Sequence, residues 1–239
     1  MRSAVATWHL ACWTRKTPGR GGLWVIAAMP LALALPFEVL ADDGGQEAAV
    51  GISCAWAVLL SAIVGRTTGV PGGWLLWPYQ KGASVSDHMV ARWVMDLALV
   101  AAAILAWCGV WALLIASGAR PGSLPIVAAT AAAMLLTALW ATALLFLVGA
   151  SGTERTTDVL AALSVVSIAQ LVFIRRLPAP WDQLVHAVLP PLLEATGVVA
   201  QVASGDVHGM AANAGQVFAW SLACMVGAVV QLRRWRPDE

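Results

Sequence analysis

Residues Arg66 to Arg92 read RTTGVPGGWLLWPYQKGASVSDHMVAR, and they form the longest stretch near the middle of the chain that is not continuously apolar. Glycine and proline break regular structure in its first half. A cluster of tryptophan, leucine and tyrosine follows, and basic residues lie at both ends and at Lys81. Such side chains are typical of the boundary between a bilayer and water. We interpret the stretch as a short amphipathic segment on the cytoplasmic membrane face, placed to contact a partner.

The composition of the chain is that of an integral membrane protein. Of its 239 residues, 60% are hydrophobic and 11% are charged, which is far from the composition of soluble domains. The apolar residues also form long blocks instead of alternating with polar ones. A soluble protein of this length needs more charged residues to cover its surface, so we exclude that class.

The first 22 residues combine four basic side chains with Trp8, Leu10 and Trp13. This pattern is typical of a helix that lies on a membrane surface, and we predict such an amphipathic elbow over 1–22. A frayed basic tail is the alternative that these residues leave open. In both cases, positive charge before the first apolar run indicates a cytoplasmic N-terminus.

Six apolar runs follow, and we compare each with the roughly 20 residues that a helix needs to cross a bilayer. No internal repeat or low-complexity linker divides the chain. The expected fold is therefore all-α, a single polytopic domain over 1–239 with six transmembrane helices. The predicted spans are 23–40, 48–64, 89–116, 124–148, 157–174 and 212–232.

The charges between the runs orient the spans. The end of the first span and the loop after it carry four acidic residues and no basic one, whereas most basic residues fall on the opposite side of the predicted bundle. Because basic residues favour the cytoplasmic side, both termini are predicted to be cytoplasmic. Arg175 and Arg176 oppose this orientation, and we expect their side chains to extend from the span end to the interface.

The stretch 177–210 separates the last two spans. It contains an apolar part, 184–202, that is interrupted by Pro190 and Pro191. Irregular backbone survives at membrane depth only when protein surrounds it, so we predict a re-entrant hairpin or a surface helix on the outer face. A seventh full span over 184–202 is the competing interpretation, and it would place the C-terminus outside.

Few polar side chains fall within the predicted spans. Asp96 follows Arg92 by four residues, which allows the two side chains to pair on one helix face. An ionisable residue inside a span indicates a functional site or a helix contact. We therefore predict a role in a transport pathway or in joining helices for one set of residues: Arg92, Asp96, Gln170, Glu194 and Gln216.

The sequence contains none of the common catalytic patterns. A phosphate-binding G-x-x-x-x-G-K-[ST], a G-x-S-x-G and an H-E-x-x-H are all missing. The four cysteines have neither C-x-x-C spacing nor histidines at ligand distance, so we expect no metal site and treat them as packing residues. Trp107, Trp111 and Trp140 lie deep in their spans, where we expect packing or lipid contact.

Two stretches resemble the membrane subunits of type-2 ABC exporters. From Gly69 to Trp93, a glycine, a leucine pair, a proline, a short polar gap and a basic residue occur in the order typical of that family. Leu177 to Asp206 is similar to the family's outer proline, apolar helix and closing glycine–acid pair, here Gly205 and Asp206. The haem-exporter B subunit of cytochrome c maturation shares this layout and size. In the first stretch the matching positions are Gly69, Leu75, Leu76, Pro78, Ser84 and Arg92.

The resemblance implies a permease of the bacterial cytoplasmic membrane, with no nucleic-acid partner. It implies that 66–88 is a coupling segment for a separate ATPase subunit, which would hold ATP and magnesium while this chain carries no cofactor and no catalytic residue. It also implies a homodimer or a heterodimer with a related permease. A membrane scaffold or assembly factor remains an alternative, and a membrane-embedded enzyme is a third. The expected ATPase contacts are Trp74, Leu75, Leu76, Trp77, Pro78 and Lys81.

Overall fold

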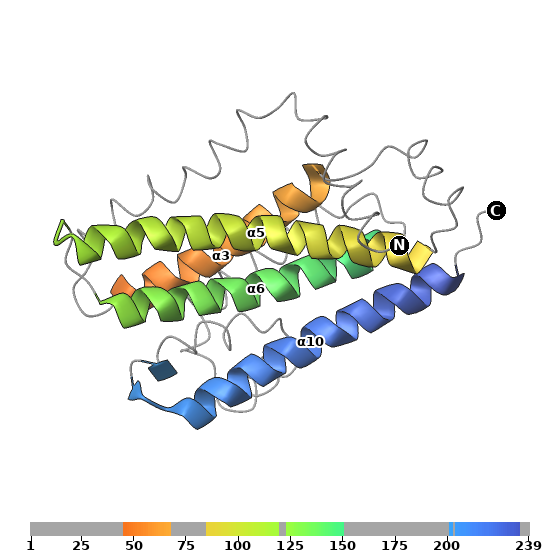
Figure 1. Ribbon diagram of the computed structural model, residues 1–239. Coiled ribbons are helices and arrows are strands. Elements are labelled where there is room, and N and C mark those ends of the chain that lie inside the picture. Colours follow the sequence, from red (N-terminus) through yellow and green to blue (C-terminus); the bar gives the residue numbers. More distant parts are fainter. Residues whose placement is uncertain (1–44, 68–84, 120–122, 151–200, 203, 235–239) are drawn as a thin grey trace.

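The computed structural model of the chain describes residues 45–67, 85–119, 123–150, 201–202 and 204–234 (Figure 1). Their regular structure is entirely helical, so the predicted all-α class is confirmed for this part of the chain. The four long helices are α3 (Gly45–Thr67), α5 (Val85–Ala116), α6 (Leu124–Ala150) and α10 (Val207–Arg234). The elbow 1–22, the spans 23–40 and 157–174, and most of the segments 66–88 and 177–210 lie outside the described residues.

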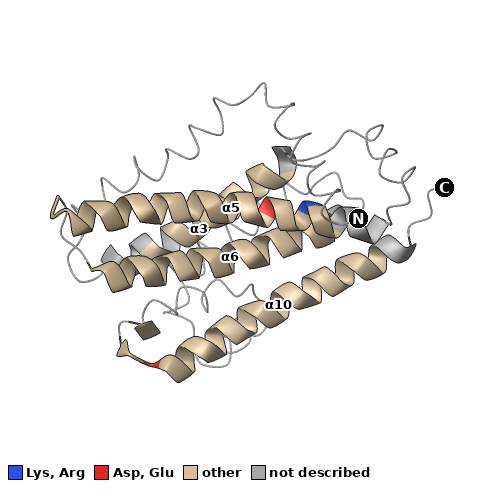
Figure 2. Ribbon diagram, viewed as in Figure 1, with Lys and Arg blue, Asp and Glu red and all other residues tan. Residues whose placement is uncertain are grey.

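Three of these helices are long and apolar enough to cross a membrane. Their apolar parts are Val90–Ala116, Leu124–Val148 and Val207–Gln231, of 27, 25 and 25 residues. At about 1.5 Å per residue, each exceeds the roughly 30 Å of a hydrocarbon core. The 23 residues of α3 include a shorter apolar part, Ser53–Gly65. Charged residues are sparse along the described helices, as Figure 2 shows.

The predicted spans and the helices agree closely at some ends and less closely at others. The span 124–148 falls within α6, and the span 89–116 ends with α5 at Ala116. Gly118 follows that end with a φ of 72°, and its N–H donates to the Ile115 carbonyl oxygen. A left-handed glycine at this place is a common helix stop. In contrast, α5 begins at Val85, within the predicted coupling segment 66–88, and α10 begins at Val207, within the predicted outer re-entrant segment 177–210.

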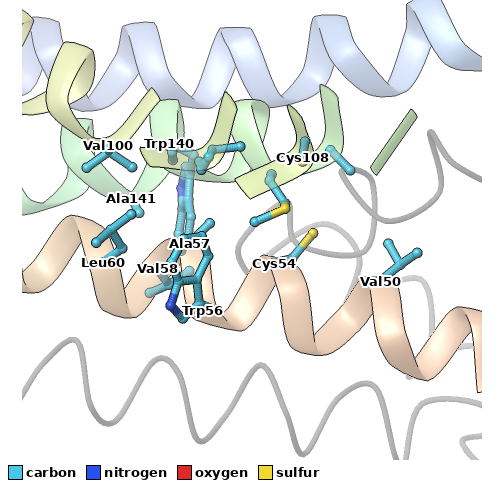
Figure 3. Close-up of a cluster of buried hydrophobic side chains, with 14 of the residues drawn as sticks. Val50, Cys54, Trp56, Ala57, Val58, Leu60, Val100, Cys108, Trp140 and Ala141 are labelled. Atoms are coloured by element: carbon cyan, nitrogen blue, oxygen red, sulfur yellow. The ribbon is translucent and has the colours of Figure 1, made fainter. Parts of the chain in front are cut away.

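Helix α6 occupies the centre of the described bundle and packs against α3, α5 and α10. Its buried side chains are mostly small, which lets the neighbouring backbones approach closely. Figure 3 shows side chains of α3 and α5, among them Cys54 and Val100, meeting those of α6 in one apolar core. The fully buried alanines of α6 are Ala133, Ala138, Ala141 and Ala143.

Contacts near one end of the bundle fix the direction of each helix. The C-terminal parts of α3, α6 and α10 meet there with the N-terminal part of α5, so α6 and α10 are parallel and α5 is antiparallel to them (Figure 1). We call this end the Arg92 end. The contacts that define it are Gly65 with Leu145, Gly227 with Leu147, and Trp93 with the cluster that contains Phe146.

Hydroxyl groups inside the bundle bond to their own helices. The hydroxyl of Thr137 donates to the Ala133 carbonyl oxygen at 2.8 Å, and that of Ser61 donates to the Ala57 carbonyl oxygen at 2.7 Å. The same four-residue spacing recurs at Ser221, whose hydroxyl donates to Val217. Burying an unpaired hydroxyl in apolar surroundings costs free energy. These local bonds therefore allow serine and threonine to be buried in apolar helices.

The predicted glycine–acid pair forms the corner at which α10 begins. Gly205 has a φ of 75°, its N–H donates to the Val202 carbonyl oxygen, and the N–H of Asp206 donates to the Gln201 carbonyl oxygen. These two bonds end the preceding turn in a Schellman arrangement. The Asp206 carboxylate then accepts a hydrogen bond from the Gly209 N–H at 3.0 Å and caps α10. The pair is therefore accounted for by helix termination and initiation.

The packing of α10 on α6 predicts different outcomes at two glycines of α10. A Cβ at Gly227 would lie 3.1 Å from Leu147 Cδ1, whereas a Cβ at Gly215 would have nothing within 4 Å. Gly227→Leu should lower the unfolding free energy by about 1–3 kcal/mol relative to Gly215→Leu because it overpacks the contact. Unfolding in mild detergent with increasing SDS measures both variants. Equal stability of the two would contradict the described α6–α10 interface.

Candidate functional site

The side chain of Arg92 joins α5 to the end of α3. Its Nη2 donates to the carbonyl oxygen of Gly65 at 2.8 Å, across 27 residues of sequence. Gly65 is one of the last four residues of α3, where carbonyl oxygens can accept hydrogen bonds from outside the helix. These oxygens also carry the partial negative charge of the helix end. The guanidinium therefore caps α3 from a neighbouring helix.

Asp96 is the second partner of Arg92. The Arg92 Nε and the Asp96 Oδ2 are 3.9 Å apart, one helical turn along α5, and their side chains are 28% and 12% exposed. The pairing predicted from the four-residue spacing is thus present. At this distance it is an ion pair and no longer a hydrogen bond. The shorter bond to Gly65 is the one that links two helices.

The residue next to Arg92 extends the contact to the rest of the bundle. Trp93 packs against the cluster of Phe146 from α6 and Ala228 from α10, and Met225 completes this cluster. The Arg92 end thus brings together residues of all four described helices. The predicted coupling segment leaves the bundle at this end, because α3 stops at Thr67 and α5 starts at Val85.

A second contact between α3 and α5 lies farther along the bundle. The rings of Trp56 and Trp107 have centroids 6.2 Å apart, and Trp107 is 6.1 Å from Trp111. Trp56 and Trp140 are both buried in the central core. The packing role expected for Trp107 and Trp140 is confirmed. The Trp56 contact was not predicted, because a single tryptophan in an apolar run gives no sign of its partner on another helix.

Of the remaining predicted site residues, the structure describes Gln216, and it does not lie at the Arg92 end. Gln216 lies on α10 with its side chain exposed, and it precedes Met225 by nine residues, or about 13 Å of helix. The neighbouring Val217 packs into the central core. The other predicted residues lie outside the described part of the chain: Trp74, Leu75, Leu76, Trp77, Pro78, Lys81, Gln170 and Glu194.

Sequence reasoning did not identify Gly65, whose carbonyl oxygen completes the site. A backbone carbonyl has no side-chain signature, but one signal was present. Gly65 stands at the end of an apolar run and is followed by Arg66 and two threonines, where a helix is expected to end and its last carbonyl groups can accept bonds from other parts of the chain. A basic residue near the start of the next span is then a suitable cap.

The described residues contain no group of three metal-ligating side chains. Cys54, Cys108 and Cys224 are buried and free, which agrees with the packing role expected for them.

Comparison with known proteins finds no matching family model, no matching curated protein and no matching solved structure.

The geometry predicts unequal roles for the two partners of Arg92. Arg92→Gln should cost about 1–2 kcal/mol of unfolding free energy because it removes a charge-assisted hydrogen bond. The coupling energy between Arg92→Gln and Asp96→Asn should stay below about 1 kcal/mol, as for other partly exposed pairs one turn apart. A double-mutant cycle in SDS titrations measures both. A coupling energy larger than the Arg92→Gln effect would show that the ion pair dominates the site.

Proposed function

We propose that this chain is the membrane subunit of an ATP-driven ABC exporter and that a separate ATPase subunit binds the segment between α3 and α5. The single observation that carries the proposal is the connection of Arg92 to Gly65. It holds together the two helix ends from which the predicted coupling segment leaves and returns. A push on that segment is then delivered to two joined helices at once.

The proposed mechanism is mechanical. Closure of the ATPase dimer around ATP moves the coupling segment, with Trp74, Leu75, Leu76, Trp77, Pro78 and Lys81 as contacts. Helices α3 and α5 carry this movement into the bundle, which alternates between an inward-open and an outward-open state. ATP can shift this equilibrium only through contacts that differ between the two states. ATP and magnesium bind to the partner, and this chain performs no bond chemistry.

The transport path lies between two permease subunits, either two copies of this chain or this chain and a related one. The central core around α6 is filled with side chains, which favours a path outside the described bundle. Arg92 and Asp96 are engaged with each other and with α3, which favours helix joining over cargo contact. Among the predicted polar residues, Gln216 is exposed and Gln170 and Glu194 remain candidates for the path.

The parallel arrangement of α6 and α10 supports the predicted order of crossings. Because α6 ends at the Arg92 end and α10 begins at the opposite end, the chain between them must cross the membrane an odd number of times. One span at 157–174 followed by an outer re-entrant segment satisfies this condition. Spans at both 157–174 and 184–202 would make two crossings, so we favour six spans with both termini in the cytoplasm.

Retention of an ATPase tests the proposal. The chain is purified from its native membrane in mild detergent, and copurifying nucleotide-binding subunits are identified and quantified. Trp77→Ala with Lys81→Glu should reduce their amount at least about tenfold, which corresponds to a contact energy of about 1.4 kcal/mol. Leu113→Ala, which truncates a residue that is 72% exposed on α5, is the control. Copurification of other membrane proteins without an ATPase would favour the scaffold alternative.

Cysteine labelling tests the orientation. In a background that lacks the four native cysteines, Ala119→Cys and Ser204→Cys should react with a membrane-impermeant maleimide in intact cells. Lys81→Cys should react only after permeabilisation, because it belongs to the cytoplasmic segment. Labelling of Ala119→Cys and Ser204→Cys from opposite sides would contradict the parallel α6 and α10. Labelling of Lys81→Cys from outside would invert the proposed orientation.

A further inference from the structure

We propose that Arg92 is the positioning residue that makes α3 and α5 move as one body, and that Asp96 holds the guanidinium against the α3 carbonyl. Two different nitrogens serve the two partners: Nη2 faces Gly65, and Nε faces Asp96. The positioning role stands on this geometry. Its consequence for transport rests on the proposed function.

The chemistry of the site requires arginine. A planar guanidinium presents several donors in fixed directions, so one side chain can bond to a carbonyl on α3 while another of its nitrogens faces a carboxylate on α5. A lysine ammonium carries the same charge on a single atom and cannot hold both partners in this geometry. Arg92→Lys therefore preserves charge near the membrane boundary while it removes the two-sided contact.

Asp96 acts through Arg92. It lies on the same helix as Arg92, so their ion pair cannot itself connect α3 to α5. Its side chain is 12% exposed, and a carboxylate in such surroundings needs a partner to stay charged. The pair restricts the rotamers of the long arginine side chain and directs it toward Gly65. Loss of the carboxylate should loosen the helix contact, and loss of the guanidinium should remove it.

The positions of two contacts between α3 and α5 explain why the contact made by Arg92 matters. Trp56 and Trp107 connect α3 and α5 within the bundle, and Arg92 connects them where the predicted coupling segment is attached. The apolar core that both helices share with α6 holds them along their length, and Arg92 adds a polar contact at the end of α3. Without Arg92, a force on the segment would displace the last turn of α3 relative to α5, and α5 would follow incompletely.

Distance measurements between spin labels test the positioning role directly. Labels are attached at Leu59→Cys on α3 and Val94→Cys on α5, both more than 40% exposed, in the background without native cysteines. Pulsed electron paramagnetic resonance in lipid nanodiscs should give one narrow distance distribution for the parent. Arg92→Lys should broaden it at least about twofold, and Asp96→Asn should broaden it less. Val110→Ala, which truncates a residue that is 44% exposed on α5, should leave the width unchanged.

An unchanged width in Arg92→Lys overturns the positioning role. If that variant does not elute as a single species, Asp96→Asn decides, because it keeps the shape of the side chain and removes its charge. An unchanged width in Asp96→Asn then overturns the role as well. A merely structural contribution to folding would lower stability without changing the distance distribution of the folded protein.

A second arm separates this inference from the proposed function. The labelled chain is prepared with its copurified ATPase and trapped with ATP and orthovanadate. The parent should keep one α3–α5 distance, while Arg92→Lys should show a second one because α3 is displaced relative to α5. If no ATPase is retained, the proposed function fails, and the measurement without nucleotide still decides the role of Arg92. If trapping changes the α3–α5 distance in neither the parent nor Arg92→Lys, the link between Arg92 and transport is wrong. The positioning role and the proposed function are not affected by that outcome.

Discussion

The last carbonyl oxygens of a helix can accept hydrogen bonds from groups outside that helix, and one such bond organises the α3–α5 pair. Arg92 donates this hydrogen bond to the Gly65 carbonyl oxygen at 2.8 Å, and Asp96 forms an ion pair with the Arg92 guanidinium. One side chain thereby caps α3, forms an ion pair with a buried carboxylate and connects two helices. The segment between α3 and α5 is therefore attached to two helix ends that Arg92 holds together.

The rest of the bundle depends on the small side chains of α6. Apolar side chains gain little from meeting one another in lipid, so helices associate through close packing. The buried alanines of α6 let α3, α5 and α10 approach it from different sides. On α10, Gly227 performs the same role against Leu147. The C-terminal parts of α6 and α10 meet at this contact, and the two helices are parallel (Figure 1).

Local features of this structure could be predicted from the sequence, whereas contacts between helices could not. The length of an apolar run sets where a span lies, and this placed α6 and the end of α5 correctly. The spacing of Arg92 and Asp96 was enough to predict their pairing. The Gly65 contact and the Trp56–Trp107 pair depend on how two helices are rotated toward each other, which a uniformly apolar surface does not reveal. The early starts of α5 and α10 were missed because helix caps extend beyond the apolar pattern.

The proposed function depends on where Arg92 connects α3 to α5. The proposed exporter role needs a contact surface on the cytoplasmic side and a stiff connection from it into the membrane. The second requirement has a structural basis in Arg92, and the first rests on the sequence of 66–88. The most direct measurement is site-specific photocrosslinking from Trp77 replaced by benzoyl-phenylalanine in native membranes. The account predicts a crosslink to a nucleotide-binding subunit, and crosslinks to lipid or to other membrane proteins alone would contradict it.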